Sequence, residues 1–140
     1  MSESSAYRLE DQVGFLLRLA NQRHVAIFQA HAPFGLTPTQ FAAMVKVAEL
    51  GACPQNELGR RTKMDVATIK GVVDRLVEKG LVKVAGDPSD RRRKIVALSD
   101  AGVAAMPELR RFGAQVSELT LESLSEDERS VLLRLVARLS

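Results

Sequence analysis

The sequence has one Cys, no Trp and no long apolar run. A single Cys cannot form an intrachain disulfide or a cysteine-based zinc site, and a chain without disulfides suits a reducing compartment. No stretch approaches the roughly 18–20 apolar residues that a membrane helix needs, and the first residues have neither the basic nor the apolar region of a signal peptide. We therefore expect a cytoplasmic protein with no membrane contact, whose 140 residues form a single domain.

The motifs of common enzymes are missing as well. The sequence contains no glycine-rich phosphate loop, no HExxH and no nucleophile elbow, and its two histidines, His24 and His31, both lie near the first predicted helix. It therefore predicts a protein that is not an enzyme and that holds no cofactor and no metal.

The net charge of +3 is unevenly distributed along the chain. Residues 54–94 contain eleven basic and six acidic residues, whereas the remainder contains nine basic and eleven acidic ones. A basic centre between mildly acidic ends indicates that the middle of the chain contacts a polyanion.

Apolar residues at steps of three and four predict a mainly α-helical chain. They place a first helix over residues 7–30, and the capping pattern from Thr37 to Gln40 opens a second helix that ends at Gly51. Helix is expected again after Ser99, with an interruption near Pro107. A second capping box at Ser125 begins the last helix, whose apolar stripe comprises Leu132, Leu135, Val136 and Leu139.

The basic centre has the pattern of a winged helix-turn-helix. A short helix begins after Pro54, and Asp65 can cap a longer one that ends before Gly80. Two strands, LVKVA and KIVAL, then flank the turn residues GDPSDRRR. Two helices joined by a tight turn and followed by a β-hairpin are typical of DNA-binding domains.

The helix predicted over residues 65–79 has two unlike faces. One carries the core residues Ile69, Val72, Val73 and Leu76. The other carries small residues and hydrogen-bond donors with one acid, namely Ala67, Thr68, Lys70, Gly71, Asp74 and Arg75. Small residues would also suit packing against another helix, but the neighbouring motif favours insertion into a major groove.

The cations Arg91, Arg92, Arg93 and Lys94 are expected on the tight turn of the hairpin. There they can enter a minor groove or contact phosphates, and we expect Asp90 to orient one arginine through a bidentate pair. A run of charges is more often a solvated loop, but its position after a helix-turn-helix favours contact with double-stranded DNA.

The stretch ELGRRTKMDVATIKGVVDRLVEKGLVKVAGDPSDRRRKIVALSDAG resembles the winged helix-turn-helix of the MarR family of bacterial transcriptional regulators. Its most specific parts are VDRLVEKGLV, DPSDRR and LSDAG. The resemblance implies that Asp90 and Arg92 are the family's wing residues, that Arg91 lies at the tip, and that Asp74 pairs with a wing arginine. Val84, Ala85 and Cys53 depart from the family's usual residues.

The resemblance also implies an organisation for the whole chain. Residues 37–98 would form the DNA-binding lobe, and helices in residues 7–35 and 99–140 would form a homodimer that binds a pseudo-palindromic operator. The apolar stripe of the last helix independently favours a two-fold partner, since a small monomer could not easily cover it. The segments YRLEDQVGFLLRLANQRH and MDVATIKGVVDRL are similar to repressors of aromatic-acid catabolism, nicotinate degradation among them.

Three residues of the first helical region are candidates for an effector site. His24 and His31 continue its apolar stripe and Arg18 lies beside it, so together they could bind a small aromatic carboxylate. For any one of them taken alone, a core histidine or a surface arginine is the more common role. In the family, the effector site lies where the dimerisation helices meet the DNA-binding lobe.

Two other readings of the chain stay open. It could bind DNA without an effector, either specifically or as a nucleoid-type protein, or the winged helix could serve protein contacts. Cys53 could also make it a redox-responsive regulator, although a lone Cys more often packs as a small apolar residue.

Overall fold

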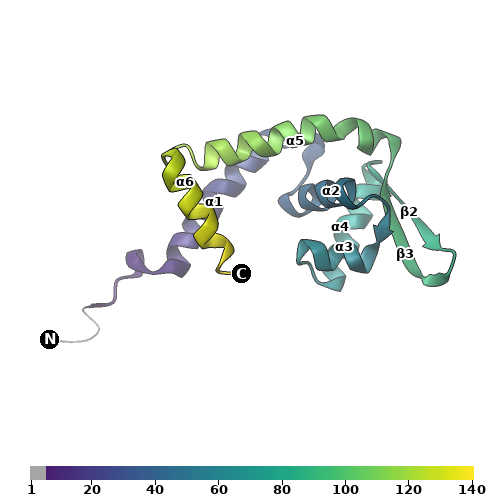
Figure 1. Ribbon diagram of the computed structural model, residues 1–140, viewed down its shortest axis with the longest axis horizontal. Helices are drawn as coiled ribbons and strands as arrows, with labels where there is room; N and C mark the ends of the chain where they lie inside the picture. Colours follow the sequence, from purple (N-terminus) through teal and green to yellow (C-terminus); the bar gives the residue numbers. More distant parts are fainter. Residues whose placement is uncertain (1–5) are drawn as a thin grey trace. The chain divides into compact units, whose positions relative to one another are not determined.

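The computed structural model describes residues 6–140 and divides into two compact units (Figure 1). One unit comprises residues 32–113, and the other combines the described part of residues 1–31 with residues 114–140. The division falls within one long helix, α5 (Asp100–Thr120). Among the described residues, no helix is long and apolar enough to cross a membrane.

The unit of residues 32–113 contains the helix-turn-helix and the hairpin. Its elements are α2 (Pro38–Leu50), β1 (Cys53–Pro54), α3 (Gln55–Thr62), α4 (Val66–Glu78), β2 (Val82–Asp87) and β3 (Asp90–Leu98), followed by the first part of α5. The sheet is antiparallel in the order β1-β3-β2, and the β2–β3 hairpin projects beyond the helices (Figure 1). The short strand β1 was not predicted, because two residues carry no periodicity.

The core of this unit is mainly aliphatic, since aromatic residues make up only 4% of the sequence. Its fully buried members include Met44, Leu58, Ile69, Leu76 and Leu109. The predicted core face of α4 is confirmed, since the exposure of its four residues does not exceed 7%. The capping box of α2 is also confirmed by reciprocal bonds between Thr37 and Gln40.

The start of α5 explains the LSDAG motif. The Ser99 hydroxyl accepts a bond from the Gly102 N–H at 3.0 Å and donates to the Gly80 carbonyl at 2.6 Å. A Cβ at position 102 would collide with the carbonyl oxygen of Leu81, so only glycine fits there.

The predicted interruption near Pro107 is wrong, because α5 continues from Asp100 to Thr120 with Pro107 inside it. Pro107 lies on the exposed side of the helix, where water can satisfy the backbone carbonyl that a proline leaves without a donor.

The second unit contains α1 (Val13–His31), the end of α5 and α6 (Glu126–Ala137). The predicted start of the first helix at residue 7 is wrong, because a 3-10 turn at Leu9–Asp11 and an extended residue, Gln12, precede α1. The second capping box is confirmed, with bonds between Ser125 and Glu128. Helices α1 and α6 line an apolar groove of about 410 Å³ whose residues include Val13, Leu17, Leu132, Leu135, Val136 and Leu139.

Candidate nucleic-acid interface

The turn between α3 and α4 is held by close packing and by a helix cap. Lys63 ends α3 in the left-handed conformation with φ 59°, and a Cβ at Gly59 would lie 3.1 Å from the Cγ2 atom of Ile69. The Asp65 carboxylate accepts a bond of 2.7 Å from the Thr68 N–H. This bond lowers the pKa of Asp65, so the carboxylate is charged at neutral pH and faces the positive end of α4.

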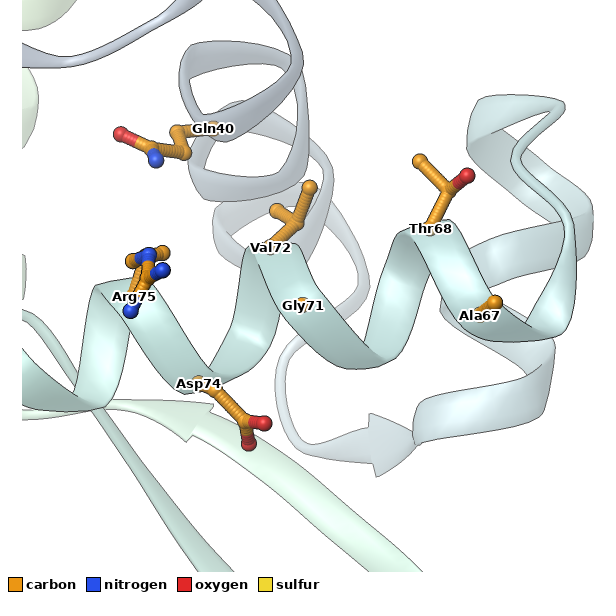
Figure 2. Close-up of a pocket in the computed structure, with 7 residues that line it drawn as sticks. All are labelled: Gln40, Ala67, Thr68, Gly71, Val72, Asp74 and Arg75. Carbon is orange, nitrogen blue, oxygen red and sulfur yellow. The ribbon is translucent and has the colours of Figure 1, made fainter.

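The outer face of α4 is exposed, as predicted. Ala67, Thr68, Gly71, Asp74 and Arg75 line a groove of about 370 Å³ together with Gln40 of α2 (Figure 2). In Figure 2, Thr68 and Val72 project on the side of α4 that faces α2, whereas Asp74 projects on the opposite side. Gln40 was not predicted in this groove, since its place in the capping box already explained it.

The side chain of Asp74 has a different partner from the one expected. Its carboxylate accepts a bond of 2.9 Å from Lys70, one helical turn away, and among the described residues it makes no ion pair with a wing arginine. This bond lowers the pKa of Asp74, and the positive charges of Lys70, Lys94 and Arg75 add to the effect. The wing residue that influences Asp74 is thus Lys94, and the carboxylate positions Lys70.

The wing is the β2–β3 hairpin. The sequence analysis expected its arginines on the turn, but the structure places them on a strand. The turn is formed by Pro88 and Ser89, while Arg91, Arg92 and Arg93 belong to β3. The register changes there, because Gly86 pairs with Lys94 whereas Asp87 pairs with Asp90. The three arginines occupy this irregularity, and all three are exposed.

The acids of the wing form local contacts. Asp90 accepts from the backbone N–H of Arg92 at 3.0 Å and from its Nε at 3.4 Å through the same oxygen, so the predicted bidentate pair is wrong. The Asp87 carboxylate accepts a bond from the Ser89 hydroxyl, and this bond lowers the pKa of Asp87. The same carboxylate lies 3.7 Å from the Arg93 guanidinium. Arg92 remains 94% exposed, so its cation is accessible to a ligand.

The structure brings cations from α4 and the wing to one cleft. Lys70, Arg92, Arg93 and Lys94 line a space of about 250 Å³ with Gln55 and Asn56 at the start of α3. Gln55 and Asn56 were missed by the sequence analysis, because polar residues at a helix start carry no signal of their own. Four cations and two amides around one opening can bind phosphate groups.

Enzyme-like clusters are missing from the part of the chain that the structure describes. No group of three or more His, Cys, Asp or Glu side chains there could hold a metal ion. Cys53 is only 5% exposed, and burial, together with the charge of Glu57, raises its pKa. A buried thiol of raised pKa is a poor nucleophile, which favours the packing role over the redox one.

The three effector candidates are not brought together within α1. The Arg18 guanidinium lies 5.4 Å from the centre of the Phe15 ring, and the half-buried His24 bonds through Nδ1 to the Thr120 hydroxyl at 2.9 Å. His31 is exposed, contrary to the expectation of an inward-facing side chain. Arg18 and His24 are six residues apart, and this spacing places them on different sides of a helix.

Arg23 of α1 makes three polar contacts near the end of α5, and the sequence analysis did not single it out. Its guanidinium donates to the carbonyls of Thr120 at 2.8 Å and Leu119 at 3.0 Å, and it lies 3.3 Å from Glu122. These carbonyls end α5, so Arg23 caps that helix from a segment distant in sequence.

Comparison with known proteins identifies the family of this arrangement. A sequence model of the MarR family matches residues 36–94. The HTH-type transcriptional repressor NicR of Pseudomonas putida is 40% identical over 138 residues, which cover 98% of this chain and 87% of that protein.

Two solved structures are similar over nearly the whole chain. A probable transcriptional regulator from Pseudomonas aeruginosa has 50% identity and a TM-score of 0.91, with 95% of this chain and 100% of that chain covered. BpsR of Bordetella bronchiseptica, whose DNA binding is regulated by 6-hydroxynicotinic acid, has 38% identity and a TM-score of 0.88, with 95% and 96% covered. The predicted fold and family are confirmed.

Proposed function

The chain belongs to the MarR family of transcriptional regulators, and we propose that it is a homodimeric repressor that a small aromatic acid releases from a pseudo-palindromic operator. Regulators of this family are not enzymes. The observation that carries the proposal is the cleft where Lys70, Arg92, Arg93 and Lys94 converge beside the exposed face of α4.

The proposed division of labour follows from the position of each side chain. Thr68 and Lys70 in the first turns of α4 contact base edges in the major groove, while Ala67 and Gly71 let the helix approach closely. Arg75 contacts the backbone farther along the helix.

Arg91, Arg92 and Arg93 contact phosphates and the minor groove. The exposed ion pair between Arg92 and Asp90 would not prevent Arg92 from contacting a phosphate, because surface ion pairs contribute only about 0–1 kcal/mol. Asp90 shapes the wing through the Arg92 N–H, and Asp74 positions Lys70.

The proposed dimer uses the apolar groove of α1 and α6. Leucines and valines line this groove in a single chain, and a two-fold partner would remove them from water. Two recognition helices would then read half-sites about 34 Å apart, one turn of the duplex.

The proposed effector is a hydroxylated aromatic acid of the hydroxynicotinate type. The regulation of BpsR by 6-hydroxynicotinic acid supports this class of ligand. Arg18 remains the candidate for the carboxylate and His24 or His31 the candidate for a ring hydroxyl. Because Arg18 and His24 lie on different sides of α1, each residue is tested separately. The effector can weaken DNA binding only to the extent that its affinity is higher for the dimer conformation that does not bind DNA.

The DNA-binding part is tested by fluorescence anisotropy on a duplex selected from a random library. Replacing Arg91 or Arg92 by Ala should weaken binding to all duplexes and reduce the slope of affinity against salt by about one per lost phosphate contact. Thr68→Ala should instead change which bases are preferred. Arg110→Ala, an exposed cation of α5, serves as the control and should change neither quantity. Identical effects of the wing and helix substitutions on every duplex would contradict the division of labour.

The effector part is tested by titrating hydroxynicotinic and hydroxybenzoic acids into the DNA complex. We expect one acid to release the duplex, and His24→Ala, His31→Ala and Arg18→Ala each to reduce its effect without weakening DNA binding. A full response in all three variants would remove these residues from the site. If no acid changed the affinity, effector-independent regulation would be the better account.

A further inference from the structure

Val66 is the most exposed large hydrophobic side chain in the described part of the chain, with 80% of its surface accessible. It is the first residue of α4 and directly follows the cap, Asp65. A β-branched residue gains little there from helix propensity, and this one gains nothing from burial. Its own fold therefore gives no reason for an apolar side chain at this position.

The surroundings of Val66 combine an apolar opening with positive charge. Val66 lines a cleft of about 300 Å³ together with the half-buried Met64 and with Gly59 and Ile69. Arg60 and Asp65 line the same cleft, and two exposed lysines, Lys63 and Lys70, lie three residues before and four residues after Val66 in the sequence. A ligand suited to this site has a small apolar group with negatively charged groups, such as phosphates, around it.

The acidic groups of this region are already paired. Asp65 accepts from the Thr68 N–H, and Glu57 bonds to Arg60 and Arg61. Glu57 thus compensates one of the two arginines that it contacts, and Asp65 keeps its charge because its partner is a neutral N–H, so the cations Arg60, Arg61 and Lys63 exceed these two acids by one. In the major groove, the 5-methyl group of thymine is the apolar feature that a base pair presents, and phosphates surround it.

We propose that Val66 contacts the 5-methyl group of one thymine in each operator half-site and thereby determines specificity at that position. This inference rests on the proposed function, since it requires α4 to enter the major groove. The first turn of a recognition helix is the part that reaches base edges. Val66 contributes an apolar contact, whereas Thr68 and Lys70 contribute hydrogen bonds.

The test removes the methyl group from the DNA and the valine from the protein. Each thymidine of the selected duplex is replaced in turn by deoxyuridine, which lacks only that methyl. Wild-type protein should lose about fourfold in affinity at one position of a half-site, the value expected for one buried methyl group. In Val66→Ala the same replacement should have no further effect, and both half-sites should behave alike.

Two controls separate the inference from the proposed function. Val103→Ala removes an exposed valine of α5 and should retain the full sensitivity to deoxyuridine. Affinity for a scrambled duplex should be equal in Val66→Ala and wild type. If Val66→Ala stayed as sensitive as wild type, or if no thymidine mattered while the selected duplex was still preferred, the inference would be wrong and the proposed function would stand. No preference for any duplex would overturn both.

Discussion

The two units of the chain differ in where their apolar side chains lie. The unit of residues 32–113 holds the whole aliphatic core, including Met44, Leu58 and Leu109, which are 0% exposed. In the described part of the other unit, Phe28 and Val116 are the only buried hydrophobic residues, and Leu132, Leu133, Leu135 and Leu139 are 38–66% exposed.

This contrast indicates that one unit is packed within a single chain, whereas the other leaves an apolar surface for a partner. The first buries an aliphatic core against which α4 packs, and α4 and the wing are the surface that we propose for DNA binding. The second leaves leucines and valines in water along a continuous groove, which is costly for a single chain and is typical of an interface. Its helices are therefore expected to complete their packing against a second copy.

The largest expected effect comes from putting charge into the groove of α1 and α6. We expect Leu132→Asp combined with Leu135→Asp to give a monomer by light scattering and to weaken operator binding by about a hundredfold or more, because avidity from the second half-site is lost. Ser130→Asp places the same charge on an exposed position of α6 outside the groove and should leave a dimer. A dimeric double variant would show that the groove is not the interface.

A substitution in the core of the unit of residues 32–113 tests the same contrast through the free energy of unfolding. Leu58→Ala should lower the free energy of unfolding by about 2–5 kcal/mol, since it opens a cavity in the core. Val77→Ala, at a 44% exposed position of α4, should change it by less than about 0.5 kcal/mol. Urea unfolding at one fixed protein concentration measures both, and similar losses would contradict the assigned core.

The contact of Arg23 with the end of α5, in the unit of the terminal helices, predicts a smaller effect. Arg23→Ala removes two bonds to the last carbonyls of α5 and should cost about 1 kcal/mol. Arg23→Lys cannot reproduce the fork of donors and should recover only part of it. Gln22→Ala, a neighbouring exposed residue, should have no effect, and an equal loss there would exclude the capping role.

The smallest expected effect is a dependence on pH at the cap of α4. The pKa of Asp65 is lowered in the folded chain by its bond to the Thr68 N–H, so its charge stabilises the fold above the pKa of the unfolded chain, about 4. This contribution is lost as the pH falls through the lower folded value. The melting temperature of Asp65→Asn should thus lie below that of wild type at pH 7 and approach it in acid. A constant difference would contradict this assignment.

The sequence predicted well the elements that depend on local chemistry. The caps at Thr37, Asp65 and Ser125 lie where the side chains indicate, because a cap is a contact over three residues. The core face of α4 also follows from its own periodicity. The family resemblance is confirmed by the comparisons with known proteins. One of the motifs that suggested it, LSDAG, combines the cap of Ser99 with the close approach at Gly102.

The errors concern features that depend on partners distant in the sequence. The register change that places Arg91–Arg93 in β3 depends on pairing with β2, and Pro107 is tolerated because its side of α5 is exposed. The grouping of Arg18 with His24 was instead a local error, since their spacing of six residues already separates them on a helix. The sequence could not reveal that Arg23 reaches the end of α5. Sequence periodicity describes faces, whereas a site requires contacts between elements.

The central claim is that the unit of residues 32–113 binds one operator half-site. The unit of the terminal helices forms the dimer and so holds two such DNA-binding units at a fixed spacing. The most direct test is to insert five base pairs between the half-sites of the selected operator, which rotates one of them to the opposite side of the duplex. The account predicts a loss of affinity of about a hundredfold, since only one half-site can then be bound. Unchanged affinity for the lengthened operator would contradict it.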